Sequence, residues 1–94
     1  IRLKEIKKMK KTSYLINVSR GAIINNSHLI KALKKNFIAG AGIDVFEKEP
    51  IGKKSSFLKL SNCLLTSHNA FNSDQAIYEI NKKTINNFIN FFKK

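Results

Sequence analysis

The segment GAGIDVFEKEP (Gly40–Pro50) lies between NVSRGAI (Asn17–Ile23) and TSHNAF (Thr66–Phe71). Each of these segments joins an apolar, strand-forming run to charged or polar residues. In open α/β sheets, the residues that carry chemistry lie where the strands end, at the carboxyl edge of the sheet. The three segments therefore predict a parallel sheet whose carboxyl edge brings together one arginine, one acid and one histidine.

Strands and helices are expected to alternate along the chain. The expected strands span residues 14–19, 38–46 and 63–67. Asn25 is a good helix cap, and apolar residues at helical spacing predict an amphipathic helix within residues 26–36. A long helix is expected to begin near Asn72, whose side chain would cap it with Gln75 in the capping-box position. Because parallel strands need crossover connections, this alternation predicts an α/β fold of three parallel strands with flanking helices.

The motifs, in this order and spacing, resemble the cofactor-binding domain of the NAD-dependent D-isomer-specific 2-hydroxy-acid dehydrogenases, the family of D-lactate and D-3-phosphoglycerate dehydrogenases. The resemblance covers nearly the whole chain. It implies that residues 1–94 form the carboxyl-terminal part of an NAD-binding domain, with a Rossmann-like, doubly wound parallel sheet. It also implies NAD as the cofactor, with NADP not excluded, and a 2-hydroxy or 2-keto acid as the substrate.

The resemblance also implies which residues form the site. Arg20 matches the family arginine that grips the substrate carboxylate and carbonyl, and Glu49 and His68 match its catalytic glutamate and histidine. Asp44 matches the aspartate that lies beside the nicotinamide and ribose. The implied cofactor contacts are Val18, Ser19, Arg20, Asp44, His68 and Ala70. The sequence departs from the family at Ser67, where proline is usual.

These residue types suit the chemistry of keto-acid reduction. The reaction needs a proton for the carbonyl oxygen, and histidine is the side chain that titrates nearest neutrality. A carboxylate against one ring nitrogen fixes the tautomer and favours the imidazolium, which is the role expected of Glu49. The guanidinium of Arg20 presents a fork that binds a planar carboxylate in bidentate fashion.

Each of these residues, taken alone, has a plainer interpretation. Arginine in a Ser-Arg-Gly turn is usually a solvated loop residue, Asp44 and Glu49 could cap a strand and a turn, and His68 could be a half-buried histidine. The three motifs in the family's order argue against coincidence. His28, on the expected helix, is interpreted as a surface residue, and Cys63 as a core residue of its strand.

Part of the dinucleotide site has no counterpart in the sequence. No G-x-G-x-x-G motif occurs, so the turn that would cradle a pyrophosphate is absent from the 94 residues. The chain begins at Ile1, as if partway through a helix, and is interpreted as the carboxyl-terminal part of a longer dehydrogenase that is inactive alone and homodimeric when complete. The last helix has a broad apolar stripe, expected either to return toward a missing catalytic domain or to cover its own sheet. The stripe consists of Ile77, Ile80, Ile85, Phe88, Ile89 and Phe92.

The formal net charge of +12 supports a second hypothesis, a basic nucleic-acid-binding domain. Against it, the sequence has no helix-turn-helix signature, no zinc-ligand spacing and no aromatic RNA-binding motif, and no metal site is expected. A third hypothesis is a non-catalytic interaction or regulatory module. No apolar run approaches the roughly 18 residues needed to cross a bilayer, and the lone cysteine fits a reducing cytoplasm, which is the expected location.

Overall fold

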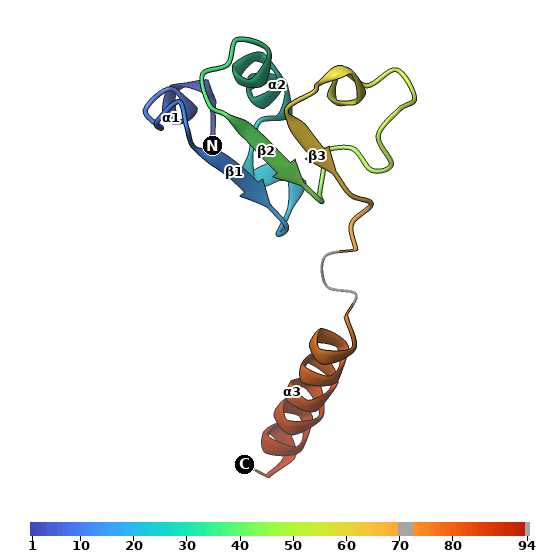
Figure 1. Cartoon of the computed structure of the whole chain (residues 1–94). Helices are drawn as coiled ribbons and strands as arrows, with labels where there is room; N and C mark the ends of the chain where they lie inside the picture. The colour runs from blue at the N-terminus through green and yellow to red at the C-terminus, as the bar shows by residue number, and fades with distance from the viewer. Residues whose placement is uncertain (70–72, 94) are drawn as a thin grey trace.

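The three expected strands form one parallel sheet in the computed structural model, which describes residues 1–69 and 73–93 (Figure 1). The strands are β1 (Tyr14–Asn17), β2 (Gly40–Ile43) and β3 (Cys63–Leu65). The sheet order is β1-β2-β3, with β2 pairing in parallel with both neighbours. The predicted α/β fold with three parallel strands is therefore confirmed.

The strands are shorter than the apolar runs predict. β2 ends at Ile43, although the apolar run continues through Val45 and Phe46, both of which are buried. These two residues lie in the loop after the strand and fill the core without joining the ladder. An apolar run therefore indicates which residues are buried, and only part of that run pairs as a strand.

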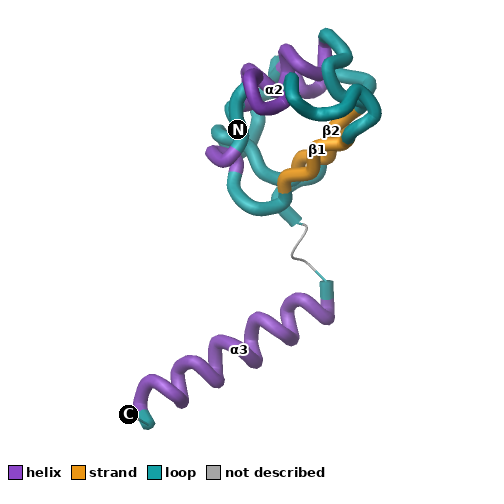
Figure 2. Tube along the Cα trace, turned by 90° about the vertical axis from the view of Figure 1, so that its left-hand side faces the viewer, coloured by secondary structure: helices purple, strands orange, loops and turns teal. Residues whose placement is uncertain are grey.

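Two helices lie on one side of the sheet. α1 (Leu3–Ile6) contacts α2 (Asn26–Lys34), and α2 covers one face of β1 and β2 (Figure 2). As predicted, Asn25 caps α2: its side-chain oxygen accepts a hydrogen bond from the His28 backbone N–H. The core between helices and sheet includes Ile6, Leu29, Ala32, Leu33, Ile38 and Ile43. Burying a side chain of this size stabilises the fold by about 1.5–3 kcal/mol.

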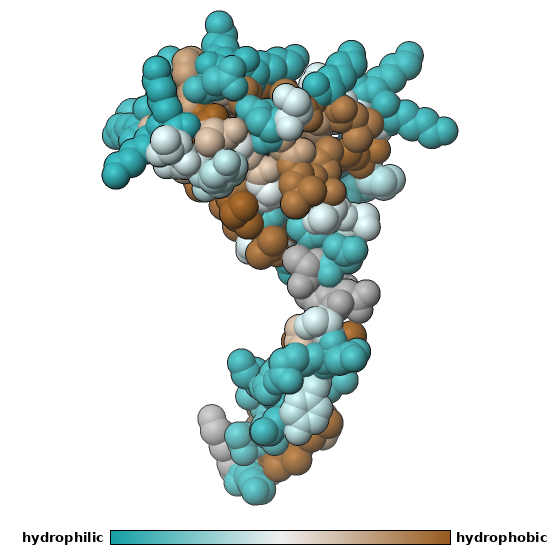
Figure 3. Space-filling model, viewed as in Figure 1, coloured by the Kyte–Doolittle hydropathy of each residue, from teal (hydrophilic) through white to brown (hydrophobic). Residues whose placement is uncertain are grey.

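The opposite face of the sheet is open. Tyr14, Ile16 and Leu64 are each more than 60% exposed. Gly40 and Gly42 lie between them on β2, paired with Tyr14 and Ile16 in the register. Hydrophobic side chains gather over the strands on the surface seen in Figure 3.

The long helix α3 (Asp74–Phe92) lies apart from the sheet (Figure 1) and contains no buried residue. The expectation that it covers its own sheet is therefore wrong for the residues described. Its cap also differs from the prediction: the Ser73 side chain accepts a hydrogen bond from the Ala76 N–H, and Gln75 bonds Glu79 instead of completing a capping box. Asn72 lies outside the described residues.

Two further expectations need correction. The amino-terminal segment does not enter partway through a helix, because α1 is a single turn that begins after an extended Arg2. His28 is half-buried instead of lying on the surface, since α1 packs against α2 and the Leu3 backbone N–H donates a hydrogen bond to His28 Nδ1. Cys63 contacts the core as expected, and burial raises the pKa of its thiol to about 11.

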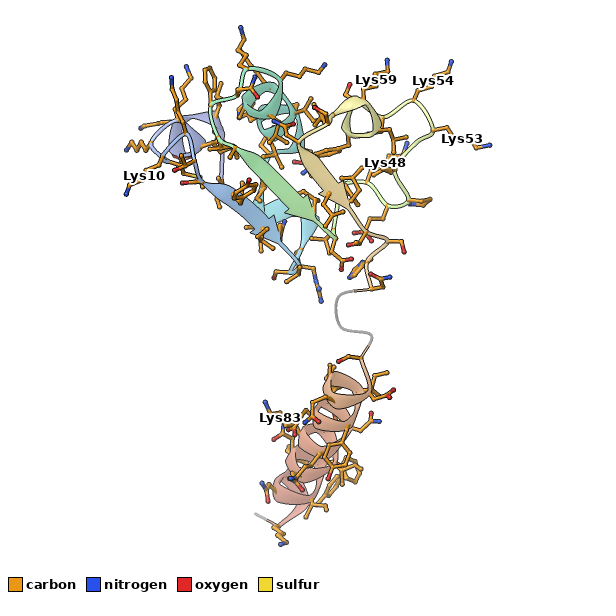
Figure 4. The ribbon with its side chains drawn as sticks, in the orientation of Figure 1. Lys10, Lys48, Lys53, Lys54, Lys59 and Lys83 are labelled. Atoms are coloured by element: carbon orange, nitrogen blue, oxygen red, sulfur yellow. The ribbon has the colours of Figure 1, made fainter. Side chains whose placement is uncertain are left out.

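The lysines are distributed over several elements. Lys10 follows α1, Lys83 lies on α3, and Lys48, Lys53 and Lys54 lie in the loop between β2 and β3, where Lys53 and Lys54 point outward (Figure 4). The labelled lysines therefore do not come from one element of the fold. In the described part of the chain, no helix is both long enough and apolar enough to span a membrane.

Candidate active site

Arg20 lies in a turn held by the side chain of Asn17. Asn17 ends β1 and is 5% exposed. Its Nδ2 donates a hydrogen bond to the Arg20 carbonyl at 3.0 Å, and its Oδ1 accepts one from the Ser19 N–H at 3.2 Å. The Arg20 guanidinium is exposed and donates to the Ser19 carbonyl at 2.8 Å. The Arg20 side chain thus lies at the surface, while the Asn17 side chain holds its backbone in place.

Gly21 brings this turn against the loop after β2. A Cβ at Gly21 would lie 2.0 Å from both the carbonyl carbon and the oxygen of Phe46, and 2.5 Å from the Glu47 nitrogen. No side chain fits that space, so the close approach of the two backbones requires glycine. The approach places the Arg20 turn beside the segment that carries Glu49.

Asp44 joins the ends of β1, β2 and β3. Its backbone N–H donates to the Asn17 carbonyl at 3.0 Å. Asp44 is 2% exposed, and its Oδ1 accepts hydrogen bonds from the Thr66 hydroxyl and, at 2.9 Å, from the Asn69 N–H. A buried carboxylate costs free energy unless it is hydrogen-bonded, and these donors meet that need.

His68 and Glu49 form a close pair at the same edge of the sheet. His68 Nδ1 lies 2.7 Å from Glu49 Oε2, with both side chains partly exposed. Glu49 Oε1 accepts a second hydrogen bond, from the Phe46 N–H, at 2.9 Å. The Phe46 N–H and then His68 hold the pKa of Glu49 below its usual value, because both contacts stabilise the carboxylate. His68 has a φ of 55°, in the left-handed region.

Two cavities meet at this pair. One, of about 270 Å³, is lined by Arg20, Gly21, Val45, Phe46, Glu47, Glu49 and His68. The other, of about 560 Å³, shares Phe46, Glu49 and His68. Its remaining lining is apolar up to the end of β3 (Pro50, Ile51, Leu58 and Leu65) and polar after it (Thr66, Ser67 and Asn69). Arg20, Glu49 and His68 all line the smaller cavity.

The predicted site residues divide into three groups. Arg20, Glu49 and His68 share the smaller cavity, whereas Asp44 is buried beneath them and bonded to the loop that carries His68. Val18 and Ser19 are exposed beyond the end of β1. Ala70 lies outside the described residues.

Sequence reasoning missed the residues that hold this arrangement. Asn17 and Thr66 both lie within the quoted motifs but had no role assigned to them. Asn26 and Glu47 were also missed: the Asn26 N–H donates to Glu47 Oε1 at 2.9 Å, and the Glu47 N–H donates to Asn26 Oδ1 at 3.0 Å. The one available signal was a polar residue inside an apolar run, such as Asn17.

Comparison with known proteins identifies a family whose sequences match this chain. Residues 1–70 match the model of the D-isomer specific 2-hydroxyacid dehydrogenase, NAD binding domain. A glyoxylate reductase of Thermococcus litoralis is 54% identical over 65 residues, which are 69% of this chain and 19% of that protein. The chain spans about a quarter or less of the length of the curated relatives it matches.

Solved structures agree with the match. The NAD-complexed D-isomer specific 2-hydroxyacid dehydrogenase of Lactobacillus delbrueckii ssp. bulgaricus is 29% identical with a TM-score of 0.76, covering 99% of this chain and 32% of that chain, so the match includes α3. The NADPH-dependent glyoxylate/hydroxypyruvate reductase of Sinorhizobium meliloti, in complex with NADP and malonate, is 34% identical with a TM-score of 0.73. That match covers 81% of this chain and 24% of the reductase.

Proposed function

The chain belongs to the D-isomer specific 2-hydroxyacid dehydrogenase family, in its NAD binding domain, and we propose that it supplies the substrate-binding arginine and the proton-transferring histidine of such an enzyme. The reaction is hydride transfer between a nicotinamide cofactor and a 2-hydroxy or 2-keto acid. The curated relatives that match include several glyoxylate reductases, which favours a small 2-keto acid such as glyoxylate as the substrate. The arrangement of Arg20, Glu49 and His68 around one cavity is the observation that carries the proposal.

Arg20 binds the carboxylate of the acid. Its guanidinium is exposed at the cavity, and the bond to the Ser19 carbonyl leaves further N–H donors on the same group. A guanidinium fork can bind both carboxylate oxygens or hold one of them and the neighbouring carbonyl oxygen. Because the backbone of Arg20 is fixed by Asn17, the side chain approaches the acid from a constant position.

His68 exchanges the proton. The Glu49 carboxylate accepts a hydrogen bond from Nδ1, so that nitrogen carries a proton, and Nε2 is the atom that we assign to give a proton to the carbonyl oxygen or to take it back. Glu49 stabilises the imidazolium through the same contact. The second bond of Glu49, from the Phe46 N–H, holds the carboxylate so that it orients the ring.

The residues present fit the nicotinamide end of the cofactor. Val18 and Ser19 are exposed beyond β1, so the carboxyl edge of the sheet offers them beside Arg20 and His68, whereas Asp44, directly after β2, is buried beneath that edge. When bound, the cofactor supplies the hydride. No residue of this chain is assigned to the pyrophosphate, because no G-x-G-x-x-G turn is present. The choice between NAD and NADP, inactivity of the chain alone, the homodimer and the cytoplasmic location stay predictions.

A graft tests the proposal. The segment of the Thermococcus litoralis glyoxylate reductase that aligns with this chain is replaced by the corresponding residues of this chain, and glyoxylate-dependent oxidation of NADH and NADPH is measured. We expect the graft to be active. His68→Asn should lower kcat by about 10²–10⁴-fold with a much smaller change in the Michaelis constant, because proton transfer is lost. Asparagine is chosen because it tolerates a positive φ.

Arg20→Lys provides the second variant, because it keeps the charge but loses the fork. We expect a higher Michaelis constant for glyoxylate together with a lower kcat. Lys53→Gln, which changes a charge in the loop away from the cavity, is the matched control and should leave both constants unchanged. An active graft whose kinetics survive His68→Asn would contradict the proposed proton transfer, and unchanged kinetics in Arg20→Lys would contradict the carboxylate clamp.

A further inference from the structure

Two buried polar side chains lie under the candidate site. Among the residues described, Asn17 and Asp44 are the polar or charged side chains that are buried. Asn17 is the last residue of β1 and Asp44 is the first residue after the neighbouring strand β2. Each bonds the loop that carries a proposed catalytic residue. Asn17 holds the turn of Arg20, and Asp44 holds the loop of His68. Burying these groups costs free energy unless their hydrogen bonds are formed. The loops must therefore keep the geometry in which these bonds to the core exist.

The contacts of Asp44 lie on both sides of His68. Thr66, two residues before His68, donates its hydroxyl to Asp44 Oδ1, and Asn69, one residue after it, donates its backbone N–H to the same oxygen. The Thr66 backbone N–H continues the ladder by donating to the Ile43 carbonyl at 3.0 Å. His68 is therefore held between two attachments to one carboxylate.

The conformation of His68 needs such support. A φ of 55° places a side chain with a Cβ in the left-handed region, which is costly for residues other than glycine and less so for asparagine, aspartate and histidine. Ser67, the residue before His68, has no ring to fix its own φ, as a proline at that position would. Uncommon backbone conformations persist when surrounding contacts determine them, and here those contacts converge on Asp44.

We propose that Asp44 and Thr66 are positioning residues that hold His68 in its left-handed conformation and so bring its ring against Glu49. This role is separate from the cofactor contact expected of Asp44, and it rests on the proposed function only for its catalytic meaning. A purely structural alternative is that the Thr66–Asp44 bond joins β2 to β3 and stabilises the sheet as a whole. The two interpretations differ in what is lost when the Thr66 hydroxyl is removed.

The test uses the 94-residue chain and Thr66→Val, which keeps the shape of the side chain and removes the donor. NMR follows the His68 ring Nδ1–H resonance and the exchange of the Asn69 amide, together with the amides of β2 as a measure of the sheet. We expect the ring resonance to disappear and Asn69 exchange to accelerate by about tenfold or more, while the β2 amides stay protected. Ser67→Ala, which removes an exposed neighbouring hydroxyl, is the control and should change none of these signals.

Thr66→Ser completes the test because it returns the hydroxyl. The ring resonance and slow Asn69 exchange should return with it. Loss of β2 protection together with both signals in Thr66→Val would favour the structural alternative and overturn the proposal. A folded Thr66→Val chain that keeps both signals would overturn the proposal, as would a folded Thr66→Ser chain that lacks them. In the graft, Thr66→Val should lower kcat more than it raises the Michaelis constant. An inactive graft beside the expected NMR result would contradict the proposed function and leave the positioning role supported.

Discussion

Helices α2 and α3 are both amphipathic, and both begin at a polar side chain that caps the first turn, yet only α2 is buried. α2 places Leu29, Ala32 and Leu33 in the core against the sheet. α3 exposes its apolar residues, including Phe88 at 66%. Helical periodicity therefore determines which face of a helix is apolar but not what that face contacts.

The largest expected effect is the difference in stability when one apolar side chain is truncated in each of the two helices. Leu33→Ala leaves a cavity in the core and should lower the free energy of unfolding by about 2–5 kcal/mol. Phe88→Ala removes an exposed side chain and should change it by less than about 0.5 kcal/mol. Urea unfolding, followed by NMR signals of β2, measures both. Equal losses in the two variants would mean that α3 packs against the sheet in solution.

The burial of α2 depends on the turn at Gly21 that leads into it. Gly21→Ala forces a methyl group into the Phe46 backbone and should destabilise the sheet by about 1–3 kcal/mol or more. Gly52→Ala is the matched control, since its Cβ would meet nothing within 4 Å and its φ is not positive. The same urea experiment applies. A Gly21→Ala chain as stable as the control would show that the close approach is not required.

The caps give a smaller contrast. Asn25→Ala should cost about 1 kcal/mol in the unfolding of the sheet, because α2 is part of that unit. Ser73→Ala should reduce the helicity of α3, seen in its Cα chemical shifts, without moving the urea midpoint of β2. If Ser73→Ala lowered that midpoint as much as Asn25→Ala, the two helices would belong to one cooperative unit.

The smallest expected effect is on the pH dependence of the stability of the sheet. Because the pKa of Glu49 is lowered on folding, its contribution to stability is present above the ordinary pKa of a glutamate and is lost as the pH falls through the lowered value. Glu49→Gln should therefore show a smaller loss of β2 stability than the unmodified chain between about pH 6 and about pH 3. Helicity of α3 should follow the same pH course in both chains. Identical pH curves for β2 would indicate that the Glu49 contacts are not formed in solution.

Much of this fold could be predicted because its signals are local. The apolar runs gave the order and positions of the strands, and Asn25 was correctly predicted as a cap. The ends of β2 were not predictable, since Val45 is as apolar as a strand residue and is buried in a loop. The cap of α3 was assigned one residue too early because Asn72 and Ser73 are both good caps and pattern alone does not rank them.

The candidate site divides in the same way. Arg20, Glu49 and His68 could be named because their motifs, in order and spacing, resemble those of a known family, and their shared cavity agrees with that grouping. The contacts of Asn17 and Thr66 could not be named, because a short polar side chain can bond many backbone groups and the partner depends on neighbouring strands. His28 was misassigned for a similar reason: its partner, the Leu3 N–H, comes from a distant segment.

The parallel pairing of the sheet has a consequence for how the chain folds. β1 pairs with β2 through Tyr14 and Gly40, and β2 with β3 through Ala41 and Cys63, so no two strands meet through a tight hairpin. Each pairing must close a long loop before any ladder bond forms, and such closure slows folding relative to helical proteins. During that time the strands are unpaired and apolar, and association with other chains competes with folding. Refolding yield should therefore fall as the chain concentration rises, even when the native state is stable.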